Sequence, residues 1–512
     1  MNSKKKVLLF IIDGFGLSGR AEGNAVRAAN PEFLLKLFRE RPFTKLTASG
    51  RDIGLPEGQM GNSEVGHLNI GAGRVVLQDI TRINHALAEG TFSENPVLQT
   101  LFSSLKASGN SLHLMGMISD GGLHCHINHL YGLLAMARQC GVTKVFVHAF
   151  TDGKDTSPTR GLHFMQELVQ KMVSLGVGRV ATICGRYFAM DRDERWDRLE
   201  KAYHAMVHGV GNRISDPVLA VEASYKANIT DEFLIPVVIE EKGQPVATIQ
   251  NGDGIVAFNF RGDRMRQLAA AFSDPTFSSF PRKPIQVAFV GMTRYSEKSV
   301  FPVVFEPLAL SGVLGESVAK AGLAQLRVAE TEKFPHVTHF LNGAVETPFP
   351  MEERIMVPSV KVKSYDQKPE MSAFEIGDVL MEKIQTQKYS LIVANFANCD
   401  MVGHTGSMDA AMKSVSTVDC VLSKVIPMAY DLGYDCIIAS DHGNAEQMID
   451  EKTGEAYPEH TLNPVPFCLL SRESYELRAE GRLCDIAPTV LELLGIEKPA
   501  VMDGSSLIVR KK

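Results

Sequence analysis

One serine and a small set of aspartates and histidines are the residues of this chain best suited to chemistry. The run GQMGNSEVGHLNIGAGR at residues 58–74 places Ser63 in a glycine-rich turn, where its hydroxyl can act as a nucleophile. Other segments supply side chains that commonly bind metals: Asp13, Asp400, His404, Asp441, His442 and His460. A serine beside two metal ions is typical of phosphoryl or sulfuryl transfer.

The spacing of these side chains favours shared metal ions. Asp400 and His404 are four residues apart, so on a helical turn both would face one ion. Asp441 and His442 are adjacent and could serve two ions a few ångströms apart. Taken singly, Asp13 could be a turn residue and His460 an ordinary loop histidine. As a set, carboxylates with imidazoles suit Mn²⁺ or a similar divalent ion better than a metal that prefers thiolates.

A second group of side chains is mostly basic, and its members follow apolar runs in the middle of the chain. Arginines grip carboxylates and phosphates through forked hydrogen bonds, so this group predicts a site for a small anionic substrate. The alternative for any one of them is a solvated helix face, as in MDRDERWDRLE. The group consists of His124, Lys154, Asp155, Arg186, Arg192, Arg261 and Arg264.

Composition narrows the class of protein. A chain of 512 residues predicts more than one domain, and we expect two. The net charge of -6 argues against a nucleic-acid partner. The eight cysteines form no CxxC pair and are expected to be reduced. The apolar run that follows KKK near the N-terminus is too short for a membrane span, and no other run approaches the required length. We therefore expect a cytoplasmic protein without a membrane partner.

The elements that must position these residues alternate between short apolar runs and longer amphipathic stretches, which predicts an α/β protein with mainly parallel sheets. Polar clusters follow the predicted strands, at the sheet edge where ligands bind. The predicted strands are 7–12, 144–149, 180–184, 255–260, 285–290, 391–395, 436–440 and 465–470. The metal-type and arginine-bearing clusters occupy different stretches. We therefore predict a metal domain of residues 1–77 and 312–512 interrupted by an inserted domain of residues 78–311, with boundaries at GAGR (71–74) and PLALSG (307–312).

The ordered motifs of the chain resemble those of the cofactor-independent phosphoglycerate mutases of the alkaline phosphatase superfamily. The motifs are IIDGFG, GNSEVGHLNIGAGR, SDGGLHCHINHL, TDGKD, GRYFAMDRDERW, NFRGDRMRQ, AETEKFPHVTHF, NFANCDMVGHTG and SDHGNAEQM. The resemblance implies an alkaline-phosphatase-like metal domain with an inserted phosphotransferase domain. It also implies two metal ions, usually Mn²⁺, and a monomer. One ion would lie among Asp13, Ser63, Asp441 and His442, and the other among Asp400, His404 and His460.

The resemblance also implies the reaction. The chain would interconvert 3-phosphoglycerate and 2-phosphoglycerate in glycolysis and gluconeogenesis through a phosphoserine at Ser63. Asp155 would shuttle the proton between the glycerate hydroxyls. The substrate would be held by His124, Lys154, Asp155, Arg186, Arg192, Arg261, Arg264 and Lys333.

Three departures from the family pattern bear on substrate affinity: Lys154 where arginine is usual, Phe334-Pro335 where a tyrosine and a small residue are commoner, and Leu462 in place of a threonine. The alternatives are a metal-dependent phosphomonoesterase or another phosphomutase of the superfamily, and a non-catalytic scaffold. The scaffold reading predicts the loss of a ligand or of the nucleophile, whereas Ser63 and every ligand position are present.

Overall fold

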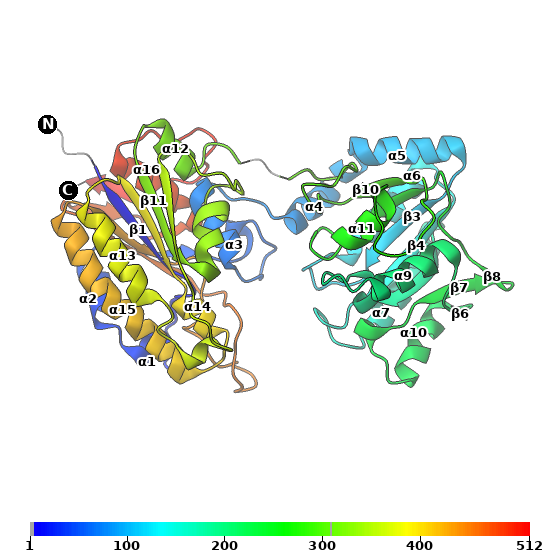
Figure 1. Ribbon diagram of the computed structural model, residues 1–512, viewed down its shortest axis with the longest axis horizontal. Helices are drawn as coiled ribbons and strands as arrows, with labels where there is room; N and C mark the ends of the chain where they lie inside the picture. The colour runs from blue at the N-terminus through cyan, green and yellow to red at the C-terminus, as the bar shows by residue number, and fades with distance from the viewer. Residues whose placement is uncertain (1–4, 308–309, 512) are drawn as a thin grey trace. The chain divides into compact units, whose positions relative to one another are not determined.

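The computed structural model describes residues 5–307 and 310–511, which divide into two compact units (Figure 1). Unit 1 comprises Met1–Gln78 and Ala309–Lys512, and unit 2 comprises Asp79–Leu308. The predicted boundary at PLALSG includes Leu308 and Ala309, which lie outside the described residues. Each unit contains a large, mainly parallel sheet, so the predicted α/β class is confirmed.

The sheet of unit 1 has the strand order β12-β11-β13-β1-β14-β15-β2-β17. The first five strands are parallel to their neighbours, and β15 is antiparallel to both β14 and β2. Apolar β-branched runs with no polar alternation form these central strands because both faces of the sheet are covered. The strands are β12 Glu352–Val357, β11 Gln325–Glu330, β13 Leu391–Phe396, β1 Val7–Ile12, β14 Asp435–Ala439, β15 Val465–Leu470, β2 Phe43–Thr47 and β17 Glu480–Arg482.

Helices cover both faces of the unit 1 sheet, and β1 shows how the core is divided. Leu8 and Phe10 pack in a cluster with α2 (Glu32–Glu40), α13 (Ala373–Gln385) and α15 (Met408–Asp431). Val7 and Leu9 point to the other face, toward α3 (Ser63–Ala72), α12 (Leu314–Lys320) and α16 (Ile486–Leu494). Successive strand residues face opposite sides, so one continuous apolar run serves two cores. Shorter elements complete the unit: α1 Ala25–Ala29, α14 Asn398–Gly403, β16 Tyr475–Leu477 and β18 Ile508–Lys511.

The sheet of unit 2 has the order β10-β9-β3-β4-β5-β7-β6, with β8 paired to β7. Its first five strands are parallel, and β7 is antiparallel to β5. The strands are β10 Ala288–Gly291, β9 Gly254–Ala257, β3 Leu112–Met117, β4 Val145–Thr151, β5 Arg179–Gly185, β7 Val237–Glu241, β6 Asn212–Ile214 and β8 Gln244–Pro245. The helices are α4 Asp79–Ala88, α5 Pro96–Ser108, α6 Ile127–Cys140, α7 Gly161–Leu175, α8 Arg186–Ala189, α9 Trp196–His208, α10 Pro217–Lys226 and α11 Arg266–Ser273.

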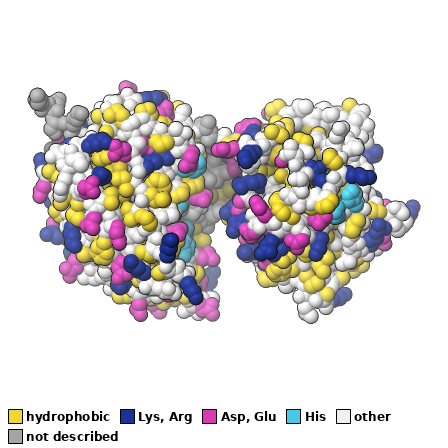
Figure 2. Space-filling view, viewed as in Figure 1, with side chains coloured by type: hydrophobic (Ala, Val, Ile, Leu, Met, Phe, Trp, Pro, Cys, Tyr) yellow, Lys and Arg dark blue, Asp and Glu magenta, His cyan; other side chains and the backbone are white. Residues whose placement is uncertain are grey.

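The surface carries charges of both signs. On the face drawn in Figure 2, acidic and basic side chains are interspersed over each unit, without a continuous basic patch among the described residues. None of the described helices is both long enough and apolar enough to span a bilayer.

Candidate active site

Five neighbouring strands bring the predicted metal ligands of unit 1 to one edge of its sheet. The parallel strands β13, β1 and β14 lead into Asp400, Asp13 and Asp441 at their carboxyl ends. Strand β11, on the far side of β13, leads into a short 3₁₀ turn, Thr331–Lys333. Because β15 runs antiparallel to β14, His460, which precedes it, lies at the same edge. This is the edge at which open α/β sheets bind ligands.

Ser63 is the first residue of α3, and local sequence explains its position. The side chain of the preceding residue, Asn62, caps the helix by accepting a hydrogen bond from the Val65 amide at 3.0 Å. Gly66 allows α3 to approach the ligand loop, because a Cβ at this position would lie 2.8 Å from the Cβ of Asp441. Ser63 is therefore buried at a helix N-terminus, where the backbone dipole favours negative charge.

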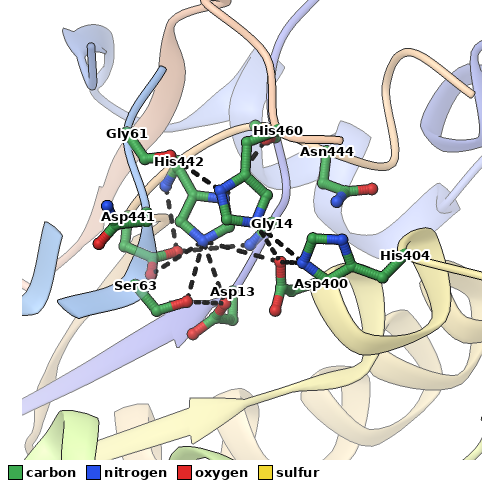
Figure 3. Close-up of polar contacts among 12 residues, drawn as sticks. Asp13, Gly14, Gly61, Ser63, Asp400, His404, Asp441, His442, Asn444 and His460 are labelled. Atoms are coloured by element: carbon green, nitrogen blue, oxygen red, sulfur yellow. Dashed lines mark hydrogen bonds and ion pairs between the residues drawn. The ribbon is translucent and has the colours of Figure 1, made fainter. Parts of the chain in front are cut away.

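The Ser63 hydroxyl is surrounded by charged groups (Figure 3). It donates to Asp13 Oδ1 at 3.0 Å and lies 3.0 Å from Nε2 of His442. The buried Lys333 ammonium donates to Ser63 Oγ at 2.5 Å, to Asp13 Oδ1 at 2.7 Å and to Asp400 Oδ2 at 2.6 Å. Burial opposes the charge on Lys333, but Asp13 and Asp400 outweigh it and raise its pKa, so this side chain stays an ammonium.

His404 and His460 present lone pairs to each other and to one carboxylate. Nδ1 of His404 lies 2.6 Å from the Pro458 carbonyl, and Nδ1 of His460 lies 2.8 Å from the Gly61 carbonyl. A carbonyl only accepts, so each Nδ1 carries a proton and, in the neutral ring, each Nε2 has a lone pair.

The two Nε2 atoms are 3.0 Å apart, and both approach Asp400 Oδ1, at 3.2 Å from His404 and 3.0 Å from His460. Three acceptors that converge in this way need either a proton on one ring or a metal cation among them.

The charge balance of the buried aspartates of unit 1 also favours bound cations. Asp13, Asp400 and Asp441 are all buried, and Lys333 is the one Lys or Arg side chain that contacts them among the described residues. Burial alone would raise the pKa of Asp13 and of Asp400, but Lys333 and neighbouring histidines lower both well below their ordinary value. Oδ2 of Asp441 is buried and accepts no hydrogen bond from the described residues. An excess of buried negative charge with an unsatisfied oxygen fits divalent cations.

His442 lies between the two ligand groups. Its Nε2 is 3.4 Å from Asp13 Oδ1, 3.6 Å from Asp441 Oδ2 and 3.8 Å from Asp400 Oδ1. Burial lowers the pKa of His442, but the charge of Asp441, with Asp13 and Asp400, raises it to about 9. A proton is therefore held at this ring unless a metal cation displaces it.

The distances between donor atoms divide the candidate ligands into two sets that differ from the two sets implied by the family resemblance. Asp400, His442 and His460 form one set of donors within 4.8 Å of one another, and Asp13, His67 and Asp441 form another. His67 replaces His442 in the second set, although both nitrogens of His67 already have partners, Ser63 O at 2.9 Å and Asn395 Nδ2 at 3.0 Å. Nε2 of His442 lies 3.4 Å from Asp13 Oδ1 and 3.6 Å from Asp441 Oδ2, so it also faces these two carboxylates.

The Glu446 carboxylate accepts hydrogen bonds from the loops that carry the predicted ligands. Its Oε2 accepts from the amides of Gly16, at 3.0 Å, and Asn444, at 2.8 Å. Its Oε1 accepts from the Thr461 hydroxyl and from Asn463 Nδ2. A Cβ added at Gly16 or at Gly443 would overlap with the carboxyl group of Glu446. The loops after β1 and β14 and the segment before β15 thus share one buried carboxylate.

In unit 2, four of the predicted residues and one unpredicted residue form a cluster at the ends of β3, β4 and β5. Nη1 of Arg186 donates to Asp152 Oδ1 at 2.6 Å and to Asp155 Oδ2 at 2.7 Å, and its Nη2 donates to His124 Nε2 at 3.0 Å. Burial and the nearby Arg186 and Arg261 lower the pKa of His124 to about 3, so its imidazole is neutral. Lys154, the fourth, is exposed, and no partner for its ammonium is found among the described residues.

The other three predicted arginines of unit 2 are more exposed than Arg186, and two of them are paired with Asp263. Nη1 of Arg192 donates to Asp263 Oδ2 at 3.0 Å, and Nε of Arg261 lies 3.1 Å from Asp263 Oδ1. Nη1 of Arg264 donates to the Met190 carbonyl at 3.2 Å. The side chains of Arg192 and Arg261 are 48% and 44% exposed, so an anion can reach them from solvent.

Several residues with clear structural roles are absent from the sequence-based prediction: His67, Asp152, Asp263, Asn395 and Glu446. Signals for three of them were available. Asp152 follows β4 as Asp13 follows β1, Asp263 lies within RGDR, and His67 is one helical turn after Ser63. Asn395 and Glu446 give no comparable signal, because their partners are distant in the sequence.

Comparisons with known proteins cover the whole chain. Residues 83–297, within unit 2, match the family model described as BPG-independent PGAM N-terminus. The 2,3-bisphosphoglycerate-independent phosphoglycerate mutase of Clostridium perfringens is 51% identical over 509 residues, 99% of each chain. That of Clostridium beijerinckii is 49% identical over 99% of this chain and 100% of the relative.

A crystal structure of Leishmania mexicana phosphoglycerate mutase, at low cobalt concentration, is 31% identical, with a TM-score of 0.73 over 99% of this chain and 98% of that chain. The resemblance stated from the motifs is confirmed. The chain belongs to the family of 2,3-bisphosphoglycerate-independent phosphoglycerate mutases.

Proposed function

We propose that this chain interconverts 3-phosphoglycerate and 2-phosphoglycerate by moving the phosphoryl group to Ser63 and back. The observation that carries the proposal is the surroundings of Ser63 Oγ: an ammonium, a carboxylate and an imidazole lie within 3.0 Å of it at the N-terminus of α3. These are groups that stabilise an alkoxide and the charge of a transferring phosphoryl group.

Two divalent cations, Mn²⁺ by the character of the donors, fit the ligands of unit 1. The converging lone pairs of His404 and His460 on Asp400 support one ion. The unsatisfied Asp441 Oδ2, with Asp13, Ser63 and His442, supports the other. When bound, such ions lower the pKa of a serine hydroxyl and neutralise phosphate oxygens.

The phosphoryl transfer proceeds in two steps that use the chain's own residues. Ser63 Oγ, as the alkoxide, attacks phosphorus. The new Oγ–P bond forms as the ester bond to the glycerate oxygen breaks, and that oxygen takes a proton from Asp155, which later removes one from the other hydroxyl; Ser63 leaves again as the alkoxide. The other glycerate hydroxyl then loses a proton, attacks the phosphoserine and releases Ser63. The Lys333 ammonium donates to Oγ throughout, which favours the alkoxide as nucleophile and as leaving group.

The glycerate is assigned to the residues of unit 2. Arg186, Arg192, Arg261 and Arg264 supply forked donors for a carboxylate, with His124 and Lys154 beside them. Asp155 moves the proton between the two hydroxyls, since it is the less buried of the two carboxylates that Arg186 holds. In this proposal unit 1 is the metal domain and unit 2 the substrate domain of a monomeric, cytoplasmic enzyme of glycolysis and gluconeogenesis.

The test is an assay for 2-phosphoglycerate after chelation, with single metals added back and bisphosphoglycerate absent. We expect Mn²⁺ to restore isomerisation. The competing assignment, a metal-dependent phosphomonoesterase, predicts release of inorganic phosphate with no 2-phosphoglycerate. That result would overturn the proposal. The scaffold alternative predicts neither product with any metal.

A further inference from the structure

His67 lies beneath the nucleophile on the same face of α3. It is four residues after Ser63, and its side chain is fully buried. Nδ1 is 2.9 Å from the Ser63 carbonyl oxygen and 3.2 Å from Asp441 Oδ2. Its ring also lies 5.5 Å from that of His336, which burial keeps neutral by lowering its pKa to about 3.

The partners of His67 decide its tautomer. Both atoms that face Nδ1, a carbonyl oxygen and a carboxylate oxygen, only accept hydrogen bonds, so Nδ1 carries the proton. Nε2 is 3.0 Å from the side-chain amide nitrogen of Asn395, which only donates. Nδ1 of His67 is therefore a donor on the Ser63 side, and Nε2 is an acceptor on the Asn395 side.

Asn395 extends the network to the other carboxylate beside Ser63. Its Nδ2 also donates to Asp13 Oδ2 at 2.8 Å. The opposite amide orientation would place Oδ1 against that carboxylate, so the orientation is determined by charge. Because Asn395 ends β13 next to β1 while His67 comes from α3, one chain of contacts joins Asp13, Asn395, His67 and Asp441.

We propose that His67 is a positioning residue for the phosphoryl transfer. Its Nδ1 bonds the Ser63 carbonyl on one side, 3.2 Å from Asp441 Oδ2, and its Nε2 accepts from Asn395, which also donates to Asp13, on the other. The ring thus fixes the backbone of Ser63 relative to the carboxylate that its hydroxyl contacts. Partners that orient a metal ligand in this way commonly change metal affinity or activity when they are removed. The inference rests on the proposed function for its catalytic consequence, but not for its effect on metal binding.

The experiment measures Mn²⁺ binding by calorimetry together with kcat and KM. His67→Ala removes both contacts, His67→Asn can restore a donor near Nδ1, and His67→Gln can restore an acceptor near Nε2. We expect His67→Ala to weaken binding of one Mn²⁺ and to lower kcat, each by about 10- to 100-fold, with little change in KM. Each conservative variant should recover part of the loss, and Asn395→Ala should reproduce it.

His148→Asn is the matched control, because His148 is also fully buried and bonded to two side chains, His113 and Thr182, in unit 2. It should lower the thermal midpoint without changing Mn²⁺ affinity or kcat. Wild-type Mn²⁺ affinity and kcat in folded His67→Asn and His67→Gln, or losses equal to those of His148→Asn, would overturn the proposal. Calorimetry requires no turnover, so failure of the mutase assay with wild type would count against the proposed function alone.

Discussion

The two clusters of charged residues differ in how their charge is balanced. In unit 1, three buried carboxylates and three imidazoles surround Ser63 with a single ammonium. In unit 2, the arginines already have carboxylate partners: Arg186 is paired with Asp152 and Asp155, and Arg192 with Asp263. The first cluster holds an excess of buried carboxylates, whereas in the second Arg186, Arg192 and Arg261 are each paired with an aspartate of their own unit.

This difference in charge balance suits the cluster of unit 1 to phosphoryl transfer and the cluster of unit 2 to substrate binding. Buried, unbalanced charge at fixed positions acts strongly on a reacting group because water does not screen it. Paired and partly exposed arginines can exchange one carboxylate for another at low cost, as reversible binding of a small acid requires. Arg186, at 3% exposure, also supports the framework of unit 2 besides its proposed contact with the glycerate, while Arg192, at 48%, is available to solvent.

The largest expected effect is the loss of the nucleophile in the unbalanced cluster. Ser63→Ala should lower mutase kcat by more than about 10⁴-fold, because no other hydroxyl can replace Oγ in the transfer. The control is Ser317→Ala, which removes a hydroxyl of equal exposure, 6%, from α12 of the same unit. Substantial turnover by Ser63→Ala, or quenched wild-type enzyme with phosphate on another residue, would remove Ser63 from the mechanism.

The second prediction tests whether Arg186 stabilises the fold of unit 2. Arg186→Ala leaves the buried Asp152 without its cation and should destabilise unit 2 by about 3 to 5 kcal/mol. Arg192→Ala, the exposed counterpart, should cost less than about 1 kcal/mol. Trp196 is the single tryptophan of the chain and lies in unit 2, so its fluorescence during urea unfolding measures both changes. Equal losses in the two variants would contradict the distinction.

A smaller effect concerns Lys154, an unpaired cation of the recognition cluster. If its ammonium binds the glycerate, Lys154→Ala should cost about 1.5 to 3 kcal/mol in transition-state stabilisation, the range for a charged hydrogen bond. It would be measured as a fall in kcat/KM. Lys154→Arg should be tolerated, since a guanidinium keeps the charge and adds a second donor. Wild-type kcat/KM in both variants would identify Lys154 as a solvent-facing loop residue.

The smallest effect is on metal affinity as the pH changes. The pKa of His442 is raised to about 9, and a hydrogen bond to Asp400 raises that of His404, so protons compete with metal at both rings. Apparent Mn²⁺ affinity should fall about tenfold per pH unit for each proton displaced, and activity should fall with it on mild acidification. Excess Mn²⁺ should restore activity. An acid limb that is independent of Mn²⁺ concentration would exclude this cause.

Half of the strands in the two large sheets could be predicted from the sequence, because these strands are apolar runs that end in polar clusters. The predicted ranges 7–12 and 465–470 match β1 and β15. Strand β10 begins at Ala288, later than predicted, because 285–287 form no strand. The strands β3 and β11 were not among the predicted ones, since His113 and Arg327 interrupt their apolar pattern. Both side chains are fully buried: His113 contacts the distant Asp253, and Arg327 donates to Gln325 of its own strand.

The candidate ligands could be predicted because they gather in short polar clusters next to apolar strands. The structure brings Asp13, Ser63, Asp400, His404, Asp441, His442, His460 and Lys333 together. The residues that orient them could not be predicted, because an asparagine or glutamate acquires such a role only from contacts across the fold. In the sequence, Asn395 is an ordinary strand residue and Glu446 is an ordinary loop residue. Only their partners in the fold show their roles.

The carboxylate of Glu446 makes three separate loops a single unit of variation. A side chain at position 16 or 443 would overlap with the Glu446 carboxyl group, and one at position 443 would also overlap with the Thr461 hydroxyl, which itself bonds Glu446. An alanine at position 16 would occupy the same volume as the Glu446 side chain. A library of variants that changes one loop at a time will therefore contain almost no functional variants. A redesign of this site has to vary all four positions together, and a shorter side chain at position 446 is the change that would open the other three.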